Sequence, residues 1–306
     1  MFLLIGSTKT ATTSIDRAVR ETGKFKFIKG IKESNYFINA PVVLGENKLF
    51  SWQQIPDISY EDYLQRFVGS GDSFEACTSY FHFAEEFIYK LKELNVDLNE
   101  FKIILILRSP HSRAKSAFLH GLRDKTEIDC LYDALLQDFC GERKERWFME
   151  RYFSMSLYYK NVSLLIENLP NIKILSYDAL MFDQSTFMNE IGKTMNVDFN
   201  SLSHLNCSEN KFGRFDLYYS DFVSQIKKII KVFLSLRSIL SNNCSSDVEL
   251  NFPDSCVYAW LDDLNKVQEI FNSDNVDEWI SQLKSGCCLD DNNTQFNPVL
   301  YKQGKV

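Results

Sequence analysis

The sequence MFLLIGSTKTATTS, residues 1–14, begins the chain with a short apolar run and a loop rich in hydroxyl side chains. We predict a buried strand over Phe2–Ile5, because consecutive large apolar residues suit a strand that is covered on both faces. The loop adds the positive charge of Lys9 and leads toward a helix, whose first backbone N–H groups would point at a bound anion. The segment therefore has the composition of an anion-binding loop. Taken alone, it also fits a threonine-rich turn that only begins a helix.

A helix is predicted directly after this loop. Ile15, Ala18 and Val19 have the i, i+3, i+4 spacing that places apolar side chains on one helix face. Thr12 or Thr13 is expected to cap the start of the helix, since threonine hydroxyls accept hydrogen bonds from the first free backbone N–H groups. A strand, a loop and a helix in this order are typical of the opening of an α/β nucleotide-binding fold.

Two further apolar runs predict buried strands at Lys102–Leu107 (KIILIL) and Ile172–Ser176 (IKILS). The first is followed by Arg108, after which Ser109 is expected as the N-cap of a helix and Pro110 as its first residue. Buried strands that alternate with helices indicate a parallel sheet covered on both faces. We therefore predict an α/β fold with one domain, built on a central parallel sheet that is flanked by helices.

The last third of the chain is predicted to be mainly helical. Apolar positions favour one helix over residues 221–240 and another over about Val257–Phe271, with a loop at 241–255 between them. No linker separates these segments from the strands, so residues 1–284 are assigned to one domain. The polar residues 285–306 are assigned to a C-terminal tail or surface extension.

Composition excludes several classes of protein. The 306 residues include 25 phenylalanines and only 6 prolines, which excludes a disordered chain. The net charge of −7 argues against binding to nucleic acid or to anionic membranes, which need a basic surface. No apolar run approaches the roughly 18 residues of a membrane span. The 8 cysteines form no CxxC pair and no metal site is expected, so we predict mostly buried thiols in a reducing, cytoplasmic setting.

The loop GSTKTATTS, residues 6–14, resembles the phosphosulfate loop of sulfotransferases, which has the pattern GxxKxGTTxL. These enzymes use 3′-phosphoadenosine 5′-phosphosulfate (PAPS) as the sulfuryl donor and release 3′-phosphoadenosine 5′-phosphate (PAP). The resemblance implies that the 5′-phosphate and the sulfonate are bound by Lys9, Thr10, Ala11, Thr12 and Thr13. Lys9 would stabilise the leaving oxygen, and Ala11 stands where the family usually has glycine. A Walker A loop does not fit, because its lysine directly precedes the helix.

A second resemblance lies in KIILILRSPHSRAKSAFLHGLRD, residues 102–124. Sulfotransferases bind the nucleotide 3′-phosphate with an arginine at the end of a strand and a serine on the next helix, positions held here by Arg108 and Ser116. Arginine offers phosphate oxygens a planar set of donors. The pattern RxPxxRAxSxxxH resembles the carbohydrate sulfotransferases of bacteria and of the Golgi. It implies that His120 stabilises the sulfuryl group or assists proton transfer; a histidine hydrogen-bonded within the fold is the alternative.

Other stretches resemble the same family in the same order. The residues KESNYF, 32–37, are similar to a KExxFF segment that carries the family's catalytic carboxylate, which makes Glu33 the candidate general base. A solvated glutamate beside Lys32 is the alternative. An SLY stretch ending at Tyr158 and a YDAL stretch at 177–180 resemble the family's SLY and YEDL segments. Tyr158 is interpreted as a packing residue rather than a chemical one.

A late basic loop completes the resemblance. Residues 206–214 (NCSENKFGR) are similar to a loop that closes over the nucleotide in sulfotransferases. The resemblance implies that the 3′-phosphate is clamped by Lys211, Gly213 and Arg214. The sequence therefore predicts the P-loop-like fold of sulfotransferases.

One segment departs from the family pattern. Residues 74–81, FEACTSYF, are similar to an EKxPxYF segment, but Ala76 replaces a frequent active-site lysine and Thr78 a frequent proline. Asn35 stands where some relatives have histidine. These changes leave the predicted nucleotide site intact and leave the acceptor unspecified.

The resemblance implies an enzyme that moves a sulfuryl group from PAPS to an acceptor hydroxyl by in-line displacement, without a metal. A glycan is one candidate acceptor, and a small alcohol, phenol or amine is the alternative. Two other classes stay open: a P-loop-type nucleotide kinase, which would need Mg²⁺ and an aspartate in place of Arg108, and a protein that binds PAP without turnover. Neither nucleic acid nor a membrane is expected as a partner, and the sequence indicates no oligomeric state.

Overall fold

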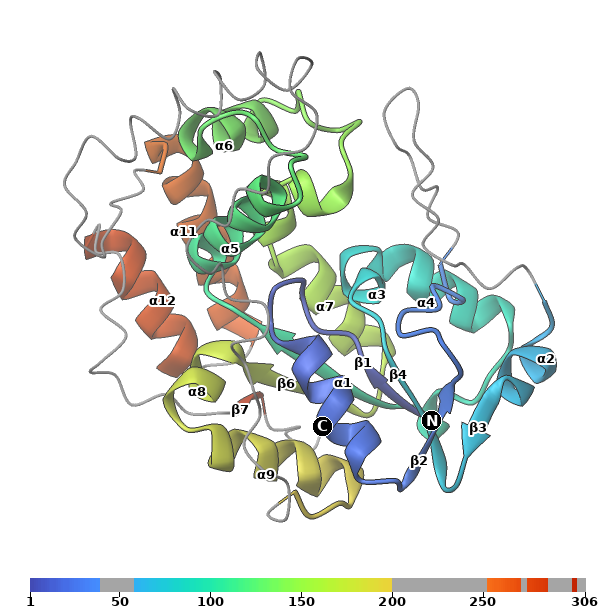
Figure 1. The fold of residues 1–306 in the computed structure, drawn as a ribbon. Coiled ribbons are helices and arrows are strands. Elements are labelled where there is room, and N and C mark those ends of the chain that lie inside the picture. The colour runs from blue at the N-terminus through green and yellow to red at the C-terminus, as the bar shows by residue number, and fades with distance from the viewer. Residues whose placement is uncertain (39–57, 200–251, 271–273, 286–298, 302–306) are drawn as a thin grey trace.

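The two sequence motifs begin on neighbouring strands at the centre of one sheet (Figure 1). The computed structural model describes residues 1–38, 58–199, 252–270, 274–285 and 299–301. Within them, strands form a 7-stranded sheet in the order β3-β2-β4-β1-β5-β6-β7. The strands are β1 (Phe2–Leu4), β2 (Phe25–Ile28), β3 (Phe67–Gly69), β4 (Asp72–Ala76), β5 (Lys102–Leu107), β6 (Ile172–Ser176) and β7 (Val299–Tyr301).

Strand β1 lies between β4 and β5 and runs parallel to both. Leu3 is opposite Glu75 on one side and opposite Ile103 on the other. Strands β2 and β6 continue the parallel arrangement, whereas β3 and β7 pair antiparallel at the two edges. Val299–Tyr301, within the stretch assigned above to a tail, thus extends the sheet. Because parallel strands end at one edge of a sheet, the residues that follow β1, β4 and β5 meet there.

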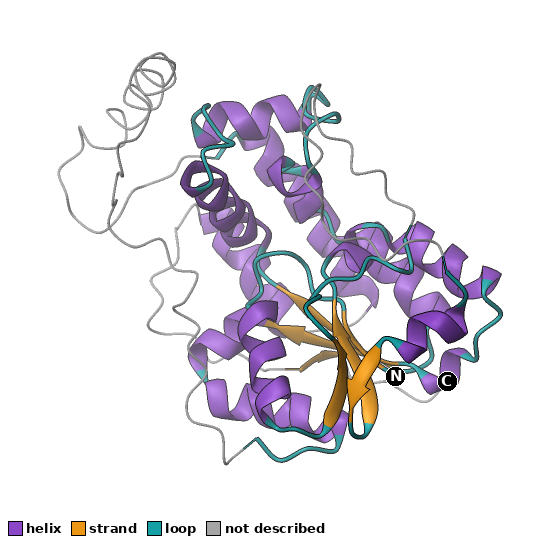
Figure 2. Cartoon of the chain, turned by 45° about the vertical axis from the view of Figure 1, so that its right-hand side comes forward, coloured by secondary structure: helices purple, strands orange, loops and turns teal. Residues whose placement is uncertain are grey.

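Helices cover both faces of the sheet (Figure 2). Along β1, Phe2 and Leu4 enter one apolar layer and Leu3 and Ile5 the other, as the alternation of side chains along a strand requires. The first layer is closed by α1 (Thr12–Glu21), α8 (Tyr177–Phe182) and α9 (Gln184–Met195). The second is closed by α2 (Tyr60–Gln65), α3 (Ser79–His82), α4 (Ala84–Glu93), α5 (Pro110–Arg123), α6 (Leu131–Phe139), α7 (Tyr159–Asn168), α11 (Asp254–Ile270) and α12 (Asp274–Ser285). Short 3₁₀ turns occur at Leu98–Glu100, Phe148–Glu150 and Ser154–Ser156.

The predicted α/β architecture is confirmed. Strands β5 and β6 have the predicted bounds, and β1 ends one residue early, although the Ile5 N–H still donates to the Ile104 carbonyl at 2.9 Å. Helix α11 begins at Asp254, before the predicted start at Val257. The helix predicted over 221–240 and most of the loop after it lie outside the described residues.

The predicted threonine cap of α1 is wrong, whereas the predicted N-cap residue of α5 is confirmed. Ala11 is the N-cap residue of α1, and neither Thr12 nor Thr13 caps it, because a left-handed turn at Ala11 already leads the chain into the helix. Ser109 is the N-cap residue of α5 and Pro110 its first residue, as predicted. The Ser109 hydroxyl nevertheless makes no hydrogen bond to the helix.

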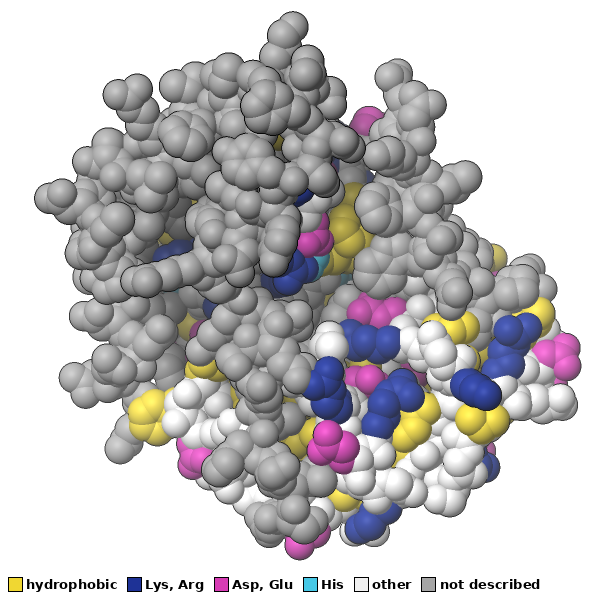
Figure 3. Space-filling view, in the orientation of Figure 1, with side chains coloured by type: hydrophobic (Ala, Val, Ile, Leu, Met, Phe, Trp, Pro, Cys, Tyr) yellow, Lys and Arg dark blue, Asp and Glu magenta, His cyan; other side chains and the backbone are white. Residues whose placement is uncertain are grey.

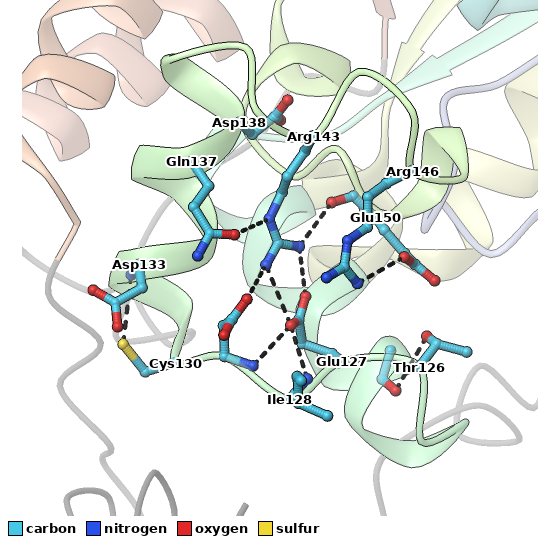
Figure 4. Close-up of polar contacts among 12 residues, drawn as sticks. Thr126, Glu127, Ile128, Cys130, Asp133, Gln137, Asp138, Arg143, Arg146 and Glu150 are labelled. Carbon is cyan, nitrogen blue, oxygen red and sulfur yellow. Dashed lines mark hydrogen bonds and ion pairs between the residues drawn. The ribbon is translucent and has the colours of Figure 1, made fainter. Parts of the chain in front are cut away.

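A buried ion pair fixes the connection between α5 and α6 (Figure 4). The Arg143 guanidinium is almost fully buried and contacts Glu127 at 2.7 Å and Asp129 at 2.9 Å. Its Nε donates to Oε1 of Gln137 in α6 at 3.0 Å. Burial alone would raise the pKa of Glu127, but the hydrogen bond with Arg143 and its charge hold that pKa below its ordinary value. Arg143 therefore ties α6 to the segment that leaves α5.

Replacing Arg143 with methionine is expected to lower the free energy of unfolding by about 3–5 kcal/mol, because the Glu127 carboxylate then stays buried without its counter-charge. Chemical denaturation followed by circular dichroism measures this change. The matched control is Lys160→Met, which breaks the exposed ion pair with Glu85 and should leave stability nearly unchanged. Equal losses in the two variants would contradict the role given to the buried pair.

Candidate anion-binding site

The loop between β1 and α1 has a backbone shaped by two left-handed residues. The Ser7 N–H donates to the Ile106 carbonyl at 2.8 Å, which continues the pairing of β1 with β5, and Thr10 Oγ1 donates to the Ser7 carbonyl at 2.6 Å. Lys9 and Ala11 have φ values of 70° and 57° on either side of Thr10. Such alternation turns successive backbone N–H groups toward one concave side, which suits an anion. The start of α1 lies at the same place and adds its dipole.

Glycine fits closely at the beginning of this loop. A Cβ on Gly6 would lie 3.0 Å from Thr10 Oγ1 and 3.3 Å from the Ile106 backbone nitrogen. The Gly6 backbone therefore lies so close to β5 that a side chain here would push its neighbours by a few tenths of an ångström. This close approach joins the loop to the strand that leads to Arg108.

Basic side chains converge on the loop. Arg108 Nη1 donates to the Lys9 carbonyl at 3.2 Å, so the residues after β1 and β5 are in direct contact, as the two motifs predicted. The Arg108 guanidinium stacks on the Tyr177 ring at 4.5 Å, and its buried Nε has no hydrogen-bond partner among the described residues. Burial, together with the charges of Arg123 and Arg108, lowers the pKa of Lys9 to about 8. Positive charge is therefore concentrated here in a chain of net charge −7.

Thr8 is held by two buried side chains that were not predicted from the sequence. The Thr8 backbone N–H donates to Nε2 of His82, at the end of α3, over 3.1 Å. Thr8 Oγ1 accepts from Nη1 of Arg113 in α5, also over 3.1 Å. Arg113 stands inside the RxPxxRAxSxxxH pattern and His82 directly after the YF of the FEACTSYF segment. Their positions in or beside these motifs were the only indication in the sequence that they lie at the site.

Glu33 lies after β2 and is held by groups from two directions. Its Oε1 accepts from Lys32 Nζ at 2.9 Å, and its Oε2 accepts from the Thr78 N–H at 3.2 Å and the Thr78 hydroxyl at 3.1 Å. Lys32 Nζ also donates to Thr12 Oγ1 at 3.5 Å, which connects this segment to the first turn of α1. The Glu33 side chain is 11% exposed. This low exposure argues against the alternative of a solvated surface glutamate, although the pairing with Lys32 is present.

A buried carboxyl group fixes the segment directly after Glu33. Glu75 accepts from the Ser34 N–H at 2.7 Å, from the Tyr63 hydroxyl at 2.6 Å and from the Tyr80 hydroxyl at 3.2 Å. Burial raises the pKa of Glu75, and these hydrogen bonds oppose the rise. Asn35 continues the network, because its side-chain oxygen accepts from Ser79. The network therefore holds Glu33 near the end of β4.

Ser116 and His120 lie one turn apart in α5, and both are partly exposed. His120 Nδ1 is 3.2 Å from an Asp124 carboxylate oxygen. Burial, together with the charge of Lys9, lowers the pKa of His120 to about 4. The imidazole is therefore neutral near pH 7 and close enough to Lys9 to respond to its charge. Both roles considered for His120, in the site and within the fold, remain compatible with this position.

The remaining predicted residues are distributed as follows. Thr10 and Thr12 are buried, whereas Thr13 is exposed on α1. Lys211, Gly213 and Arg214 lie outside the described residues. The hydroxyl of buried Tyr158 donates to the Arg108 carbonyl at 2.7 Å. That contact supports the end of β5.

Side chains of several chemical types gather on one face of the molecule. Lys or Arg, Asp or Glu and His side chains lie close to one another there (Figure 3). Among the described residues, no three His, Cys, Asp or Glu side chains are placed to hold a metal ion. No described helix has the length and hydropathy needed to cross a membrane. Cys77 and Cys256 are buried, Cys130 is partly exposed and Cys140 is exposed, and all of these are free thiols.

A loop with converging cations at the carboxyl edge of a parallel sheet defines an α/β protein with a site for an anion. The chain is similar to a sulfotransferase from Alicyclobacillus acidocaldarius, with 15% identity and a TM-score of 0.61 over 88% of this chain and 94% of that one. It is also similar to the sulfotransferase domain from the curacin biosynthetic pathway, with 9% identity and a TM-score of 0.39 over 70% of this chain and 78% of that one. The first similarity shows that the fold is that of sulfotransferases. No protein-family model and no curated protein matches the chain.

Replacing Ala11 with glycine is expected to raise the free energy of unfolding by roughly 1 kcal/mol. The left-handed conformation costs an L-residue about 1–2 kcal/mol, and the greater backbone freedom of unfolded glycine offsets part of that gain. The matched control is Ala18→Gly in the middle of α1, which should lower stability by about 1 kcal/mol. Urea denaturation of both variants compares the signs. A loss of stability in both would show that Ala11 carries no such strain.

Proposed function

We propose that the protein is a sulfotransferase that moves a sulfuryl group from PAPS to an acceptor hydroxyl. The observation that carries this proposal is the contact between Arg108 Nη1 and the Lys9 carbonyl. It joins a loop suited to one phosphate group with an arginine suited to another. A donor with phosphate groups at both ends of one nucleoside would use both parts, whereas a ligand with a single anionic group would use only one of them.

The residues around this contact fit PAPS as the donor substrate. The concave loop at Lys9 and Ala11 and the start of α1 would receive the 5′-phosphate and the sulfonate. The free Nε of Arg108 is a buried donor without a partner among the described residues, and a 3′-phosphate would supply one. Ser116 would add a hydroxyl. The loop residues Lys211, Gly213 and Arg214 are proposed to complete this phosphate site on the strength of the sequence resemblance alone.

The proposed chemistry is an in-line displacement at sulfur. The acceptor oxygen forms a bond to sulfur while the bond from sulfur to the bridging phosphate oxygen breaks, and PAP leaves. Lys9 would stabilise the negative charge that develops on the bridging oxygen, and Glu33 would take the acceptor proton. His120 would stabilise the sulfuryl group or assist proton transfer, as the sequence resemblance implies. These fixed groups supply positioning and charge, which are the main requirements of such a transfer.

The acceptor is proposed to be an uncharged hydroxyl compound, with a glycan as one candidate and a small alcohol or phenol as another. Ala76 removes the lysine that many carbohydrate sulfotransferases have at this position, and Ala76 itself is fully buried. The acidic balance of the chain disfavours polymers that already carry many sulfate groups. Transfer of labelled sulfate across a panel of oligosaccharides, phenols, alcohols and amines would identify the class.

PAP should stabilise the protein in the absence of Mg²⁺. At 100 times the dissociation constant, the expected gain is about 2.7 kcal/mol. Arg108→Gln removes charged donors to a phosphate and should weaken PAP binding by about 1.5–3 kcal/mol, roughly 10- to 150-fold. Thermal unfolding and titration calorimetry measure these effects, with Lys160→Gln as the control on the exposed surface. Stabilisation by Mg-ATP equal to that by PAP would instead favour a nucleotide kinase.

Glu33→Gln should reduce the rate of labelled-sulfate transfer by at least about 100-fold, the usual contribution of a general base. The glutamine oxygen can still accept the two hydrogen bonds from Thr78, so the fold and PAP binding should be retained. The matched control is Glu61→Gln, at an exposed position of α2. A full transfer rate in Glu33→Gln with the physiological acceptor would rule out Glu33 as the base.

A further inference from the structure

Arg113 and Arg143 are both buried arginines, but their guanidinium groups have different kinds of hydrogen-bond partner. Arg143 meets the carboxylates of Glu127 and Asp129, as a buried charge normally must. Arg113 is 0% exposed and, among the described residues, donates only to neutral oxygen atoms. Its acceptors are Ser156 Oγ at 2.6 Å, Thr8 Oγ1 at 3.1 Å, the Tyr152 carbonyl at 2.7 Å and the Arg151 carbonyl at 3.5 Å. The positive charge of Arg113 is therefore held in place without direct neutralisation.

That charge lies directly behind the loop that carries Lys9. Burial lowers the pKa of Arg113, and Asp138 and the charge of Arg108 act on it in opposite directions. Asp138 is itself engaged with the backbone of Phe153 and with Ser154. Arg113 in turn contributes to the lowered pKa of Lys9. An anion on the open side of the loop would therefore feel the charge of Arg113 as well as that of Lys9.

His82 acts on the backbone of the same residue. Because the Thr8 N–H donates to His82 Nε2, that nitrogen carries no proton, and the neutral ring has its proton on Nδ1. Burial, followed by the charge of Arg113, lowers the pKa of His82 well below its ordinary value. Arg113 therefore helps to keep His82 in the one protonation state that can accept from Thr8.

The backbone next to Thr8 needs such support. Lys9 has a φ of 70°, a left-handed conformation that costs a residue with a side chain about 1–2 kcal/mol. A strained conformation persists only where its surroundings determine it. Thr8 is held from one side through its N–H and from the other through its hydroxyl, which leaves the chain little freedom just before Lys9.

We propose that His82 and Arg113 are positioning residues that clamp Thr8 and so hold Lys9 in the left-handed conformation in which the loop receives the donor anion. The clamp itself follows from the contacts of Thr8, and only its purpose rests on the proposed function. Neither residue need touch the donor. Arg113 acts through Thr8 and through its unneutralised charge, and His82 acts through the backbone.

Paired variants separate the clamp from simple packing. His82→Leu has a similar size and no acceptor, whereas the side-chain oxygen of His82→Gln can again accept from the Thr8 N–H. We expect hydrogen exchange at the Thr8 amide, measured by NMR without ligand, to become at least tenfold faster in His82→Leu and to stay near the wild-type rate in His82→Gln. The dissociation constant for PAP should rise at least tenfold in the first variant and less than threefold in the second.

Arg113 is tested by Arg113→Met and Arg113→Lys, with Arg143→Met as the control at a buried arginine away from the loop. We expect Arg113→Met to weaken PAP binding at least tenfold and Arg113→Lys, which keeps the charge but not the fork of donors, to give an intermediate loss. Folded Arg143→Met should bind PAP with wild-type affinity. In wild-type protein, imidazole nitrogen shifts should show the Nδ1-protonated tautomer of His82 at neutral pH.

The outcomes distinguish the clamp from the proposed function. Wild-type exchange and wild-type PAP affinity in both His82→Leu and Arg113→Met would overturn the clamp. Failure of the wild-type protein to bind PAP would overturn the proposed function, while the exchange rates and the His82 tautomer would still decide on the clamp. If His82→Leu does not fold, an Nε2-protonated tautomer in the wild-type protein would by itself overturn the clamp, and the Nδ1-protonated form together with wild-type-like His82→Gln would support it.

Discussion

The parallel pairing of β1 with β5 is the constraint on which the candidate site depends. It brings the loop after one strand and the arginine after the other to the same edge of the sheet. Gly6 allows the loop to continue against β5, and Arg108 then reaches the Lys9 carbonyl. The helices that begin at this edge, α1 and α5, add their N-terminal dipoles to the charges of the side chains. A cationic site can therefore form on a chain whose overall charge is negative.

Those parts of the fold that depend on local composition could be predicted from the sequence. Continuous apolar runs identified the bounds of β5 and β6 to the residue. A strand covered on both faces is apolar at nearly every position, so its ends are easy to locate in the sequence. The proximity of Lys9 and Arg108 followed from the order of the motifs and from the rule that parallel strands end together. The cap of α1 was predicted wrongly, because a threonine-rich sequence does not reveal that the preceding alanine is left-handed.

Other parts of the site depend on contacts between distant segments and could not be predicted. His82 meets Thr8 across 74 positions of sequence and Arg113 meets it across 105. The sequence does not show that His82 is a neutral hydrogen-bond acceptor or that Arg113 has no carboxylate partner among the described residues. Both properties depend on which groups the completed fold buries beside these residues. The role of Thr78 could not be predicted either. The sequence showed that Thr78 replaces a proline of the family pattern, but not that its N–H and hydroxyl both donate to Glu33.

The hydrogen bonds of Glu33 have a directional consequence. A carboxylate has about four lone-pair positions, two on each oxygen. Thr78 fills both positions on Oε2 with its backbone and hydroxyl donors, and Lys32 fills one on Oε1. Among the donors that the structure describes, this leaves one position open, on Oε1 beside the ammonium group of Lys32. A hydroxyl that bonds to this carboxylate without displacing Thr78 or Lys32 therefore approaches Oε1 from one direction. Stereochemical selection among acceptors can begin with this contact, before any of their other atoms are recognised.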